Sequence, residues 1–375
     1  MTYKLKHKPI DIRRISPNSV PDIETHVVFE KVRIAATKEI IFGHDDGTYD
    51  FESLSSIYTN DYQTHEVILS VVKKCLIGPR PEGLPRYWPF FLNDYYLWNF
   101  LSVAAKEALQ KQSKIIMDGE LLSPIGVSNK IRIGGKAVFL FLFDNIDHLY
   151  RESLPTIIAL KEVYGTLSGH VFIVPHCTEN MLSILQLIGI KREQVVQVGN
   201  TWIECEEVVI SSFLSFGHLH TPSNYYLKTC DELLSAIKIT KFDELPKKIF
   251  VSRRNASQRR IENEIELYSD LIELGFFICD PGDYSMDEQI ALFSSAEVIV
   301  GSHGMGIANC AFSKNLKLLV EIMPTTWNRV SYYRLAQLRD AKYACYWISP
   351  INGQLVINKL KFMSFIENIE GIKCY

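Results

Sequence analysis

The chain has 375 residues and a net charge of −3, with 47% hydrophobic and 22% charged residues. This length favours two domains, each with its own core, and the composition excludes long disordered segments. Because there is no excess of positive charge, no nucleic-acid partner is expected.

Residues Met1 to Pro9 are basic but lack the apolar core of a signal peptide, and the longest apolar run, Ala137–Phe143, is too short to cross a bilayer. The eight cysteines include no Cys-x-x-Cys pair, which argues against a zinc site and a disulfide framework. We therefore expect a cytoplasmic protein.

Residues 1–110 are the least regular part of the chain. Val27–Ile34 has the pattern of a strand, His44–Gly47 that of a hairpin turn, and Tyr87–Leu101 is rich in aromatic residues. We expect these residues to form an N-terminal extension that packs on the first half of the protein.

Residues 111–220 are predicted to form a first Rossmann-like half. Strands are expected at Ala137–Phe143, Val171–Val174 and Val195–Val198, separated by segments with apolar residues at helical spacing. This alternation is typical of a parallel sheet with helices on both faces.

Residues 221–350 show the same alternation more clearly. Strands are expected at Ile249–Ser252, Phe276–Cys279, Val298–Val300 and Leu318–Ile322. Two capping-box spacings, Asn255 with Gln258 and Ser285 with Glu288, predict helices after the first two strands. We expect a second Rossmann-like half here, and an amphipathic segment within residues 351–375 that returns to the first half.

Ligands of open α/β sheets bind beyond the carboxyl ends of the strands, where Arg253, His303 and Glu321 are expected. His303 belongs to the glycine-rich segment Ser302–Asn309, which precedes a short predicted helix. Glycines let the backbone approach an anion closely, and the helix N-terminus favours a phosphate. The segment alone is a weak signal, because a tight turn with a surface histidine has the same pattern.

The neighbouring charged residues allow more than one interpretation. Arg253 leaves its strand directly into the predicted crevice, where a guanidinium group can hold a phosphate bidentately. Arg259 and Arg260 are expected instead to be solvated and paired with acidic neighbours such as Glu262. Glu321 either accepts the two ribose hydroxyls of a nucleotide or pairs with a nearby lysine.

A second candidate site lies upstream, at His148 and Glu152. If the segment that begins at Asn145 is helical, these two side chains lie four residues apart on one face and form a base with its orienting carboxylate. Pro155 leaves the alternative open that both lie in a loop, as a capping and surface pair.

The sequence contains no Asp-x-Asp triplet, which metal-dependent sugar transferases commonly use to hold a divalent ion. The charge of a diphosphate is therefore expected to be neutralised by side chains and helix dipoles, without a metal or another cofactor.

Four segments occur in an order that resembles glycosyltransferase family 61: Val251–Glu264, Glu288-Gln289, Gly301–Asn309 and Val320–Pro324. The upstream segment Asn145-x-x-His-x-x-x-Glu-x-Leu-Pro155 is also similar, so the resemblance covers about residues 135–350. The family includes plant xylosyl- and arabinosyltransferases, animal O-linked N-acetylglucosaminyltransferases and bacterial capsule enzymes.

The resemblance implies a GT-B architecture, in which two Rossmann-like halves face a cleft, and an inverting, metal-independent transfer from a nucleotide sugar, for which UDP is the expected nucleotide. It places His148 and Glu152 at the acceptor. The residues implied at the donor are Arg253, Ser302, His303, Gly304, Met305, Gly306, Asn309 and Glu321. At Met305 the family often has alanine.

The absence of the membrane anchor found in Golgi members fits a bacterial enzyme of capsule or surface polysaccharide synthesis, associated peripherally with a membrane complex. The acceptor is then an oligosaccharide or polysaccharide. The alternative is a non-catalytic protein of the same architecture that binds a nucleotide or a glycan.

Overall fold

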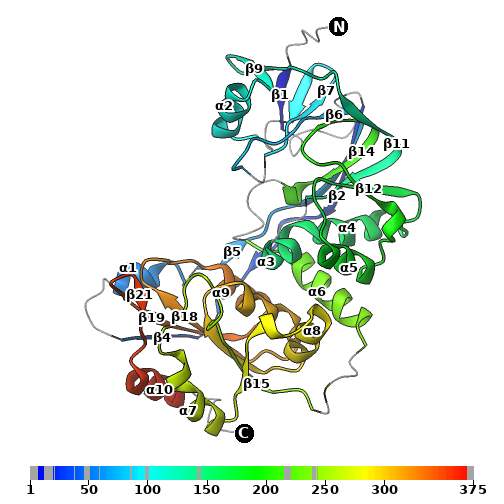
Figure 1. Cartoon of the computed structure of the whole chain (residues 1–375). Coiled ribbons are helices and arrows are strands. Elements are labelled where there is room, and N and C mark those ends of the chain that lie inside the picture. The colour runs from blue at the N-terminus through cyan, green and yellow to red at the C-terminus, as the bar shows by residue number, and fades with distance from the viewer. Residues whose placement is uncertain are drawn as a thin grey trace. The chain divides into compact units, whose positions relative to one another are not determined.

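The computed structural model describes residues 7–369 except 12–19, 21, 38, 46–50, 59, 85–86, 98–100, 142–144, 215–220, 239–241 and 243. The chain divides into two compact units, labelled by element in Figure 1. Unit 1 comprises residues 1–31 and 65–219, and unit 2 comprises residues 32–64 and 220–375. Residues 1–110 are therefore not a single extension on the first half, because their middle third belongs to unit 2.

Unit 1 contains a mixed sheet. Its strands are, in spatial order, β1 (Lys8–Ile10), β8 (Tyr95–Leu97), β7 (Phe90–Leu92), β6 (Val67–Ile77), β14 (Trp202–Ser211), β11 (Lys130–Phe139), β12 (His170–Val174) and β13 (Val195–Gln197), with β2 (Ile23–Phe29) also on β6. The run from β14 to β13 is parallel, as expected for a Rossmann-like half, but β2, β6 and β7 pair antiparallel. No strand is predicted at β14, because three glutamates interrupt its apolar pattern.

The remaining elements of unit 1 are a hairpin, β9 (Ile115–Asp118) with β10 (Leu121–Pro124), and the helices α2 (Val103–Lys111), α3 (Ile146–His148), α4 (Pro155–Tyr164) and α5 (Glu179–Leu187). Short helical turns lie at η4 (Arg192–Gln194) and η5 (Ser212–Leu214). Between α3 and α4, η3 (Leu149–Ser153) is a π-helix. Pro155 is the first residue of α4, where its missing N–H costs nothing.

Unit 2 is built on a fully parallel sheet. Its order is β16 (Phe277–Cys279), β15 (Lys248–Val251), β17 (Val298–Ser302), β18 (Leu318–Pro324), β19 (Lys342–Ile348) and β4 (Ile40–His44). The four strands predicted in this part of the sequence are confirmed. The edge strand β4 comes from residues 32–64, and the residues of the expected hairpin turn after it lie partly outside the described chain.

The helices of unit 2 are α1 (Phe51–Ser56), α6 (Asn224–Ala236), α7 (Tyr268–Glu273), α8 (Met286–Ser294), α9 (Ser331–Leu338) and α10 (Lys359–Asn368). Short helical segments are η6 (Glu264–Leu267), η7 (Pro281–Asp283) and η8 (Met305–Phe312), and short pairs are β3 (Arg33–Ile34) with β5 (Tyr62–Gln63) and β20 (Pro350–Ile351) with β21 (Gln354–Leu355).

Alternate residues of the unit 2 strands face opposite sides of the sheet. Val300, Val320 and Ile322 pack with side chains of α7 and α10 in one buried core. The C-terminal segment therefore packs within unit 2 rather than returning to the first half (Figure 1).

The predicted start of one helix is wrong, although a helix, α7, does follow β15. Asn255 does not cap a helix, because its side chain instead donates to Asp280, and Arg259 takes a left-handed backbone conformation that interrupts any helix there. Regular structure resumes only at η6. The second capping box, Ser285 with Glu288, is confirmed at the start of α8.

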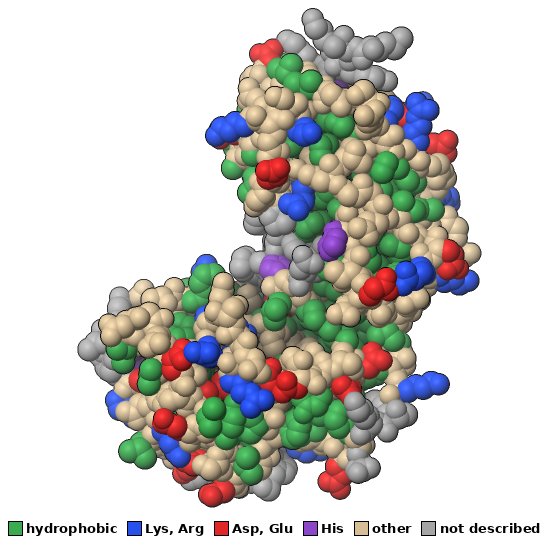
Figure 2. Space-filling model, viewed as in Figure 1, with side chains coloured by type: hydrophobic (Ala, Val, Ile, Leu, Met, Phe, Trp, Pro, Cys, Tyr) green, Lys and Arg blue, Asp and Glu red, His purple; other side chains and the backbone are tan. Residues whose placement is uncertain are grey.

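In the described part of the chain, no helix combines the length and apolar character needed to cross a membrane. On the face shown in Figure 2, lysine and arginine side chains are interspersed with aspartate and glutamate.

Candidate functional site in unit 2

The order of strands in unit 2 marks the place where a ligand is expected. The chain runs from β15 outward to β16 and then returns to β17 on the other side of β15. Loops that leave the carboxyl ends of such a strand pair diverge and open a crevice. Arg253 follows β15 and His303 follows β17, so the sheet brings these two residues to the reversal point.

Arg253 forms no ion pair with a carboxylate of the described residues, although Glu264 and Asp280 favour its charge at longer range. Among the described residues its side chain donates one hydrogen bond, from Nη2 to the Gln258 carbonyl at 2.9 Å, and its buried Nε has no partner. Burial, and then the nearby Arg259 guanidinium, lower the pKa of Arg253. Both causes disfavour the charged form of Arg253, and an anion bound here would stabilise that form.

Arg259 belongs to the same cluster, contrary to the prediction that it is solvated. Its backbone φ is 53°, a conformation that costs a non-glycine residue about 1 kcal/mol or more. Two hydrogen bonds hold it there: Arg259 Nε donates to the His303 carbonyl at 3.0 Å, and Ser302 Oγ donates to the Arg259 carbonyl at 3.3 Å. Arg260 pairs with Glu262, as expected.

His303 is oriented by a buried carboxylate. Its Nδ1 is hydrogen-bonded to Glu321 Oε1, and the Tyr343 hydroxyl donates to Glu321 Oε2 at 2.5 Å. Burial, together with the Glu321 charge, raises the pKa of Tyr343, so that hydroxyl remains a donor. With Nδ1–H directed at Glu321, Nε2 is the nitrogen left for a ligand, and within the described chain it has no partner.

Glu321 therefore has neither of its two expected roles. It is 0% exposed, and both oxygens are occupied by His303 and Tyr343, so it accepts no ribose hydroxyls and pairs with no lysine. The alternation of β18 explains this, because Glu321 faces the side of the sheet opposite to that of Val320 and Ile322.

The glycines make room for protein atoms as well as for a ligand. A Cβ on Gly304 would lie 1.9 Å from Arg253 Nη1, so this glycine is what lets the guanidinium lie against the turn. A Cβ on Gly301 or on Gly306 would instead clash with Val251, at 2.8 Å and 2.9 Å respectively. Their role is strand and helix packing.

Met305 and Asn309 differ in accessibility. Met305, at the start of η8, is exposed and open to a ligand. Asn309 is 1% exposed, and its Nδ2 donates to Gln289 Oε1 at 2.9 Å. Gln289 in turn donates to the carbonyls of Pro281 and Tyr284, so it links Asn309 to the neighbouring loop.

A buried glutamate fixes the start of the Arg253 loop. Glu264 accepts hydrogen bonds from Ser252 Oγ at 2.6 Å and from the Arg253 N–H at 3.0 Å. The Tyr268 hydroxyl also donates to Glu264. These contacts hold the backbone of Arg253 in place at the end of β15.

The second predicted pair, His148 and Glu152, forms in unit 1. Nδ1 of His148 lies 2.5 Å from Glu152 Oε2, and both residues are helical, which settles the alternative left open by Pro155. The Asn145 side chain caps this helix. Next to the pair, Arg151 is buried and donates to Asp147 at 2.8 Å.

Sequence reasoning missed several residues of the unit 2 site. Tyr343 and Trp327 stand outside the glycine-rich segment, and nothing in the local pattern distinguishes them. Arg259 was detectable through the cluster of six basic residues between Lys247 and Arg260. Within the described residues, no group of three or more His, Cys, Asp or Glu side chains that could hold a metal occurs.

Two solved structures are similar to the chain over 69% of its length and 75% of theirs. One is the bacterial iron-containing dodecameric glycosyltransferase TibC from enterotoxigenic E. coli H10407, with 9% identity and a TM-score of 0.29. The other is the dodecameric iron-containing heptosyltransferase TibC in complex with ADP-D-beta-D-heptose, with 10% identity and a TM-score of 0.28. At these scores neither alignment carries an argument.

No curated protein matches the sequence. Residues 146–320 match the family model described as Glycosyltransferase 61. The matched range begins just before His148 and ends just before Glu321, so it includes the histidine–glutamate pair of unit 1 and most of the unit 2 site. The match supports a glycosyltransferase of this family.

Proposed function

We propose that the protein is an inverting, metal-independent glycosyltransferase that moves a sugar from a nucleotide sugar to a hydroxyl group of a glycan. The observation that carries the proposal is the pair of arginines, Arg253 and Arg259, at the strand reversal point of unit 2, neither of which forms an ion pair with a described carboxylate. Two such cations in partial burial disfavour each other, and a diphosphate is the donor group that would neutralise both.

His303 completes the diphosphate site in this proposal. With Nδ1 held by Glu321, a protonated His303 donates from Nε2 to a phosphate oxygen, and the amide groups at the start of η8 add partial positive charge. This set of groups stabilises the negative charge that develops on the leaving diphosphate, the task that a metal ion performs in other sugar transferases.

The acceptor step is assigned to His148 and Glu152. Glu152 orients the imidazole, which takes the proton of the acceptor hydroxyl. The acceptor oxygen forms its bond to the anomeric carbon, and the bond from that carbon to the diphosphate oxygen breaks. Because the oxygen attacks opposite the leaving group in one displacement, the anomeric configuration inverts.

The finer assignments belong to the same proposal. UDP is the nucleotide we expect, and an oligosaccharide or polysaccharide of a bacterial capsule or cell surface is the acceptor. Such a role fits a cytoplasmic enzyme that associates with a membrane complex for polysaccharide synthesis.

A matched pair of variants tests the donor site. Arg253→Gln removes a guanidinium that forms no ion pair with a described carboxylate, whereas Arg254→Gln removes an exposed neighbour that pairs with Asp283. Thermal shift with UDP, GDP, ADP, CDP, CMP and dTDP should identify a stabilising nucleotide for the wild type and for Arg254→Gln but not for Arg253→Gln. Equal stabilisation of all three proteins would contradict the assignment, as would a wild type that binds no nucleotide.

A further inference from the structure

A pocket of about 540 Å³ opens beside the arginine cluster, entirely within unit 2. It lies at the carboxyl ends of the strands, where the loops after β15 and β18 meet the β20–β21 hairpin that follows β19. The volume is in the range of small-molecule sites. Nothing in the resemblance or in the family match assigns it a ligand.

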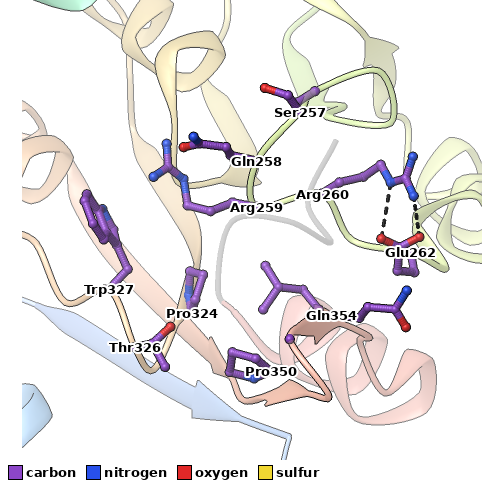
Figure 3. A pocket seen from close by; sticks show the side chains of 13 residues that line it. Ser257, Gln258, Arg259, Arg260, Glu262, Pro324, Thr326, Trp327, Pro350 and Gln354 are labelled. Carbon is purple, nitrogen blue, oxygen red and sulfur yellow. Dashed lines mark hydrogen bonds and ion pairs between the residues drawn. The ribbon is translucent and has the colours of Figure 1, made fainter.

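The chemistry of the pocket changes from one end to the other. Figure 3 shows Trp327 and Arg259 next to each other at one end, with Gln354 and Pro350 further along. The Arg259 guanidinium lies 5.2 Å from the centre of the Trp327 ring and, through its Nε, is hydrogen-bonded to the carbonyl of His303. The pocket is therefore continuous with the proposed diphosphate site at Arg259.

Trp327 is unusually placed for a large aromatic residue, because 40% of it is exposed. The buried Tyr58 holds its loop: the hydroxyl proton of Tyr58 is shared between Asn328 Oδ1, at 2.9 Å, and the Arg329 carbonyl, at 3.1 Å. Arg329 is exposed, and its guanidinium lies 4.6 Å from the ring centre. An exposed indole on a fixed loop and beside cations suits a flat ring that is attached to an anion.

The geometry points to this pocket as the site of the nucleoside of the donor, with the base packed on Trp327 and the side-chain amides of Gln258 and Gln354 available to its polar edge. The inference rests on the proposed function, because the diphosphate at Arg253 and Arg259 is what directs the nucleoside to this side. The pocket residues, rather than Glu321, are then the nucleoside contacts, because Glu321 is fully buried.

Calorimetric titration separates the nucleoside from the diphosphate. Inorganic pyrophosphate reports on the arginine site alone, whereas UDP, GDP, ADP, CDP and dTDP report on both. The ratio of the affinity for the tightest nucleoside diphosphate to that for pyrophosphate therefore measures the contribution of the nucleoside. We expect Trp327→Ala to lower this ratio about 10-fold or more, and Trp327→Phe to retain most of it, because stacking on a base needs an aromatic face.

Phe277→Ala is the matched control, since Phe277 is an aromatic residue of unit 2 with a similar exposed fraction, 36%, and does not line the pocket. It should leave the ratio unchanged. An unchanged ratio in Trp327→Ala, or an equal loss of pyrophosphate affinity, would overturn the nucleoside assignment while leaving the donor proposal intact. A wild-type protein that binds neither pyrophosphate nor any nucleotide would overturn the proposed function itself.

Discussion

Adding one methyl group at Gly304 should weaken diphosphate binding without unfolding the protein. In the Gly304→Ala variant the new Cβ would lie 1.9 Å from Arg253 Nη1 and 2.5 Å from its Cζ. Ordinary contact begins at 3.4 Å, so the guanidinium must move by about 1.5 Å. The atoms that must move are at the end of a flexible side chain. The φ of Gly304 is 159°, however, which residues with a Cβ rarely adopt, so the alanine also strains the backbone of the turn.

A displacement of this size removes Arg253 from hydrogen-bonding distance of a diphosphate oxygen. Losing a hydrogen bond to a charged group costs about 1.5–3 kcal/mol, which corresponds to roughly 10- to 150-fold in affinity. We therefore expect the dissociation constant for pyrophosphate, measured by calorimetry, to rise by that factor. The free energy of unfolding in urea should fall by about 1–3 kcal/mol, because alanine is strained at the backbone conformation of Gly304.

Gly306→Ala provides the comparison. Its Cβ would meet Val251 Cγ1 at 2.9 Å and Pro281 Cγ at 3.1 Å, atoms of the packed interior, and overpacking of this kind costs about 1–3 kcal/mol of stability. Reduced stability with retained pyrophosphate affinity is expected. If Gly304→Ala binds pyrophosphate as tightly as the wild type, the guanidinium over the turn is not part of the anion site.

Three further variants test neighbouring contacts. Tyr343→Phe leaves one oxygen of the buried Glu321 carboxylate without its donor, so urea denaturation should show a loss of about 1–3 kcal/mol, and a smaller loss would argue that this bond is weak. Glu152→Gln should lower the rate of transfer at least about 100-fold with unchanged nucleotide affinity, since the residue is assigned to the acceptor step. Equal losses of transfer rate and nucleotide affinity would contradict this assignment. The hydrogen bond from Lys317 lowers the pKa of Glu297, so the stability it adds is present above its ordinary pKa of 4.5 and is lost as the pH falls through the lowered value. Glu297→Gln should therefore reduce the melting temperature more at pH 7 than at pH 3, and an equal reduction at both would refute the electrostatic origin.

The sequence determined much of the parallel sheet of unit 2 on its own. Short apolar runs such as Val298–Val300 and Leu318–Val320 are buried on both faces, and such strands have a continuous apolar pattern that can be recognised locally. The pair of His148 and Glu152 was also predictable, because a spacing of four residues brings two side chains together on any helix. The Ser285 capping box follows from the same kind of local rule.

The tertiary structure decided what depends on residues far apart in the chain. Strand β4 joins the unit 2 sheet beside β19, which lies about 300 residues later, and no local pattern encodes that pairing. Glu321 became a partner of His303 and Tyr343, because the pleat of β18 directs it away from the core shared by Val320 and Ile322. Arg259 joined Arg253 only through a left-handed turn that the Ser302 hydroxyl and the His303 carbonyl hold in place. Local spacing thus identifies which residue types are available, and the sheet order determines which of them meet at the anion site.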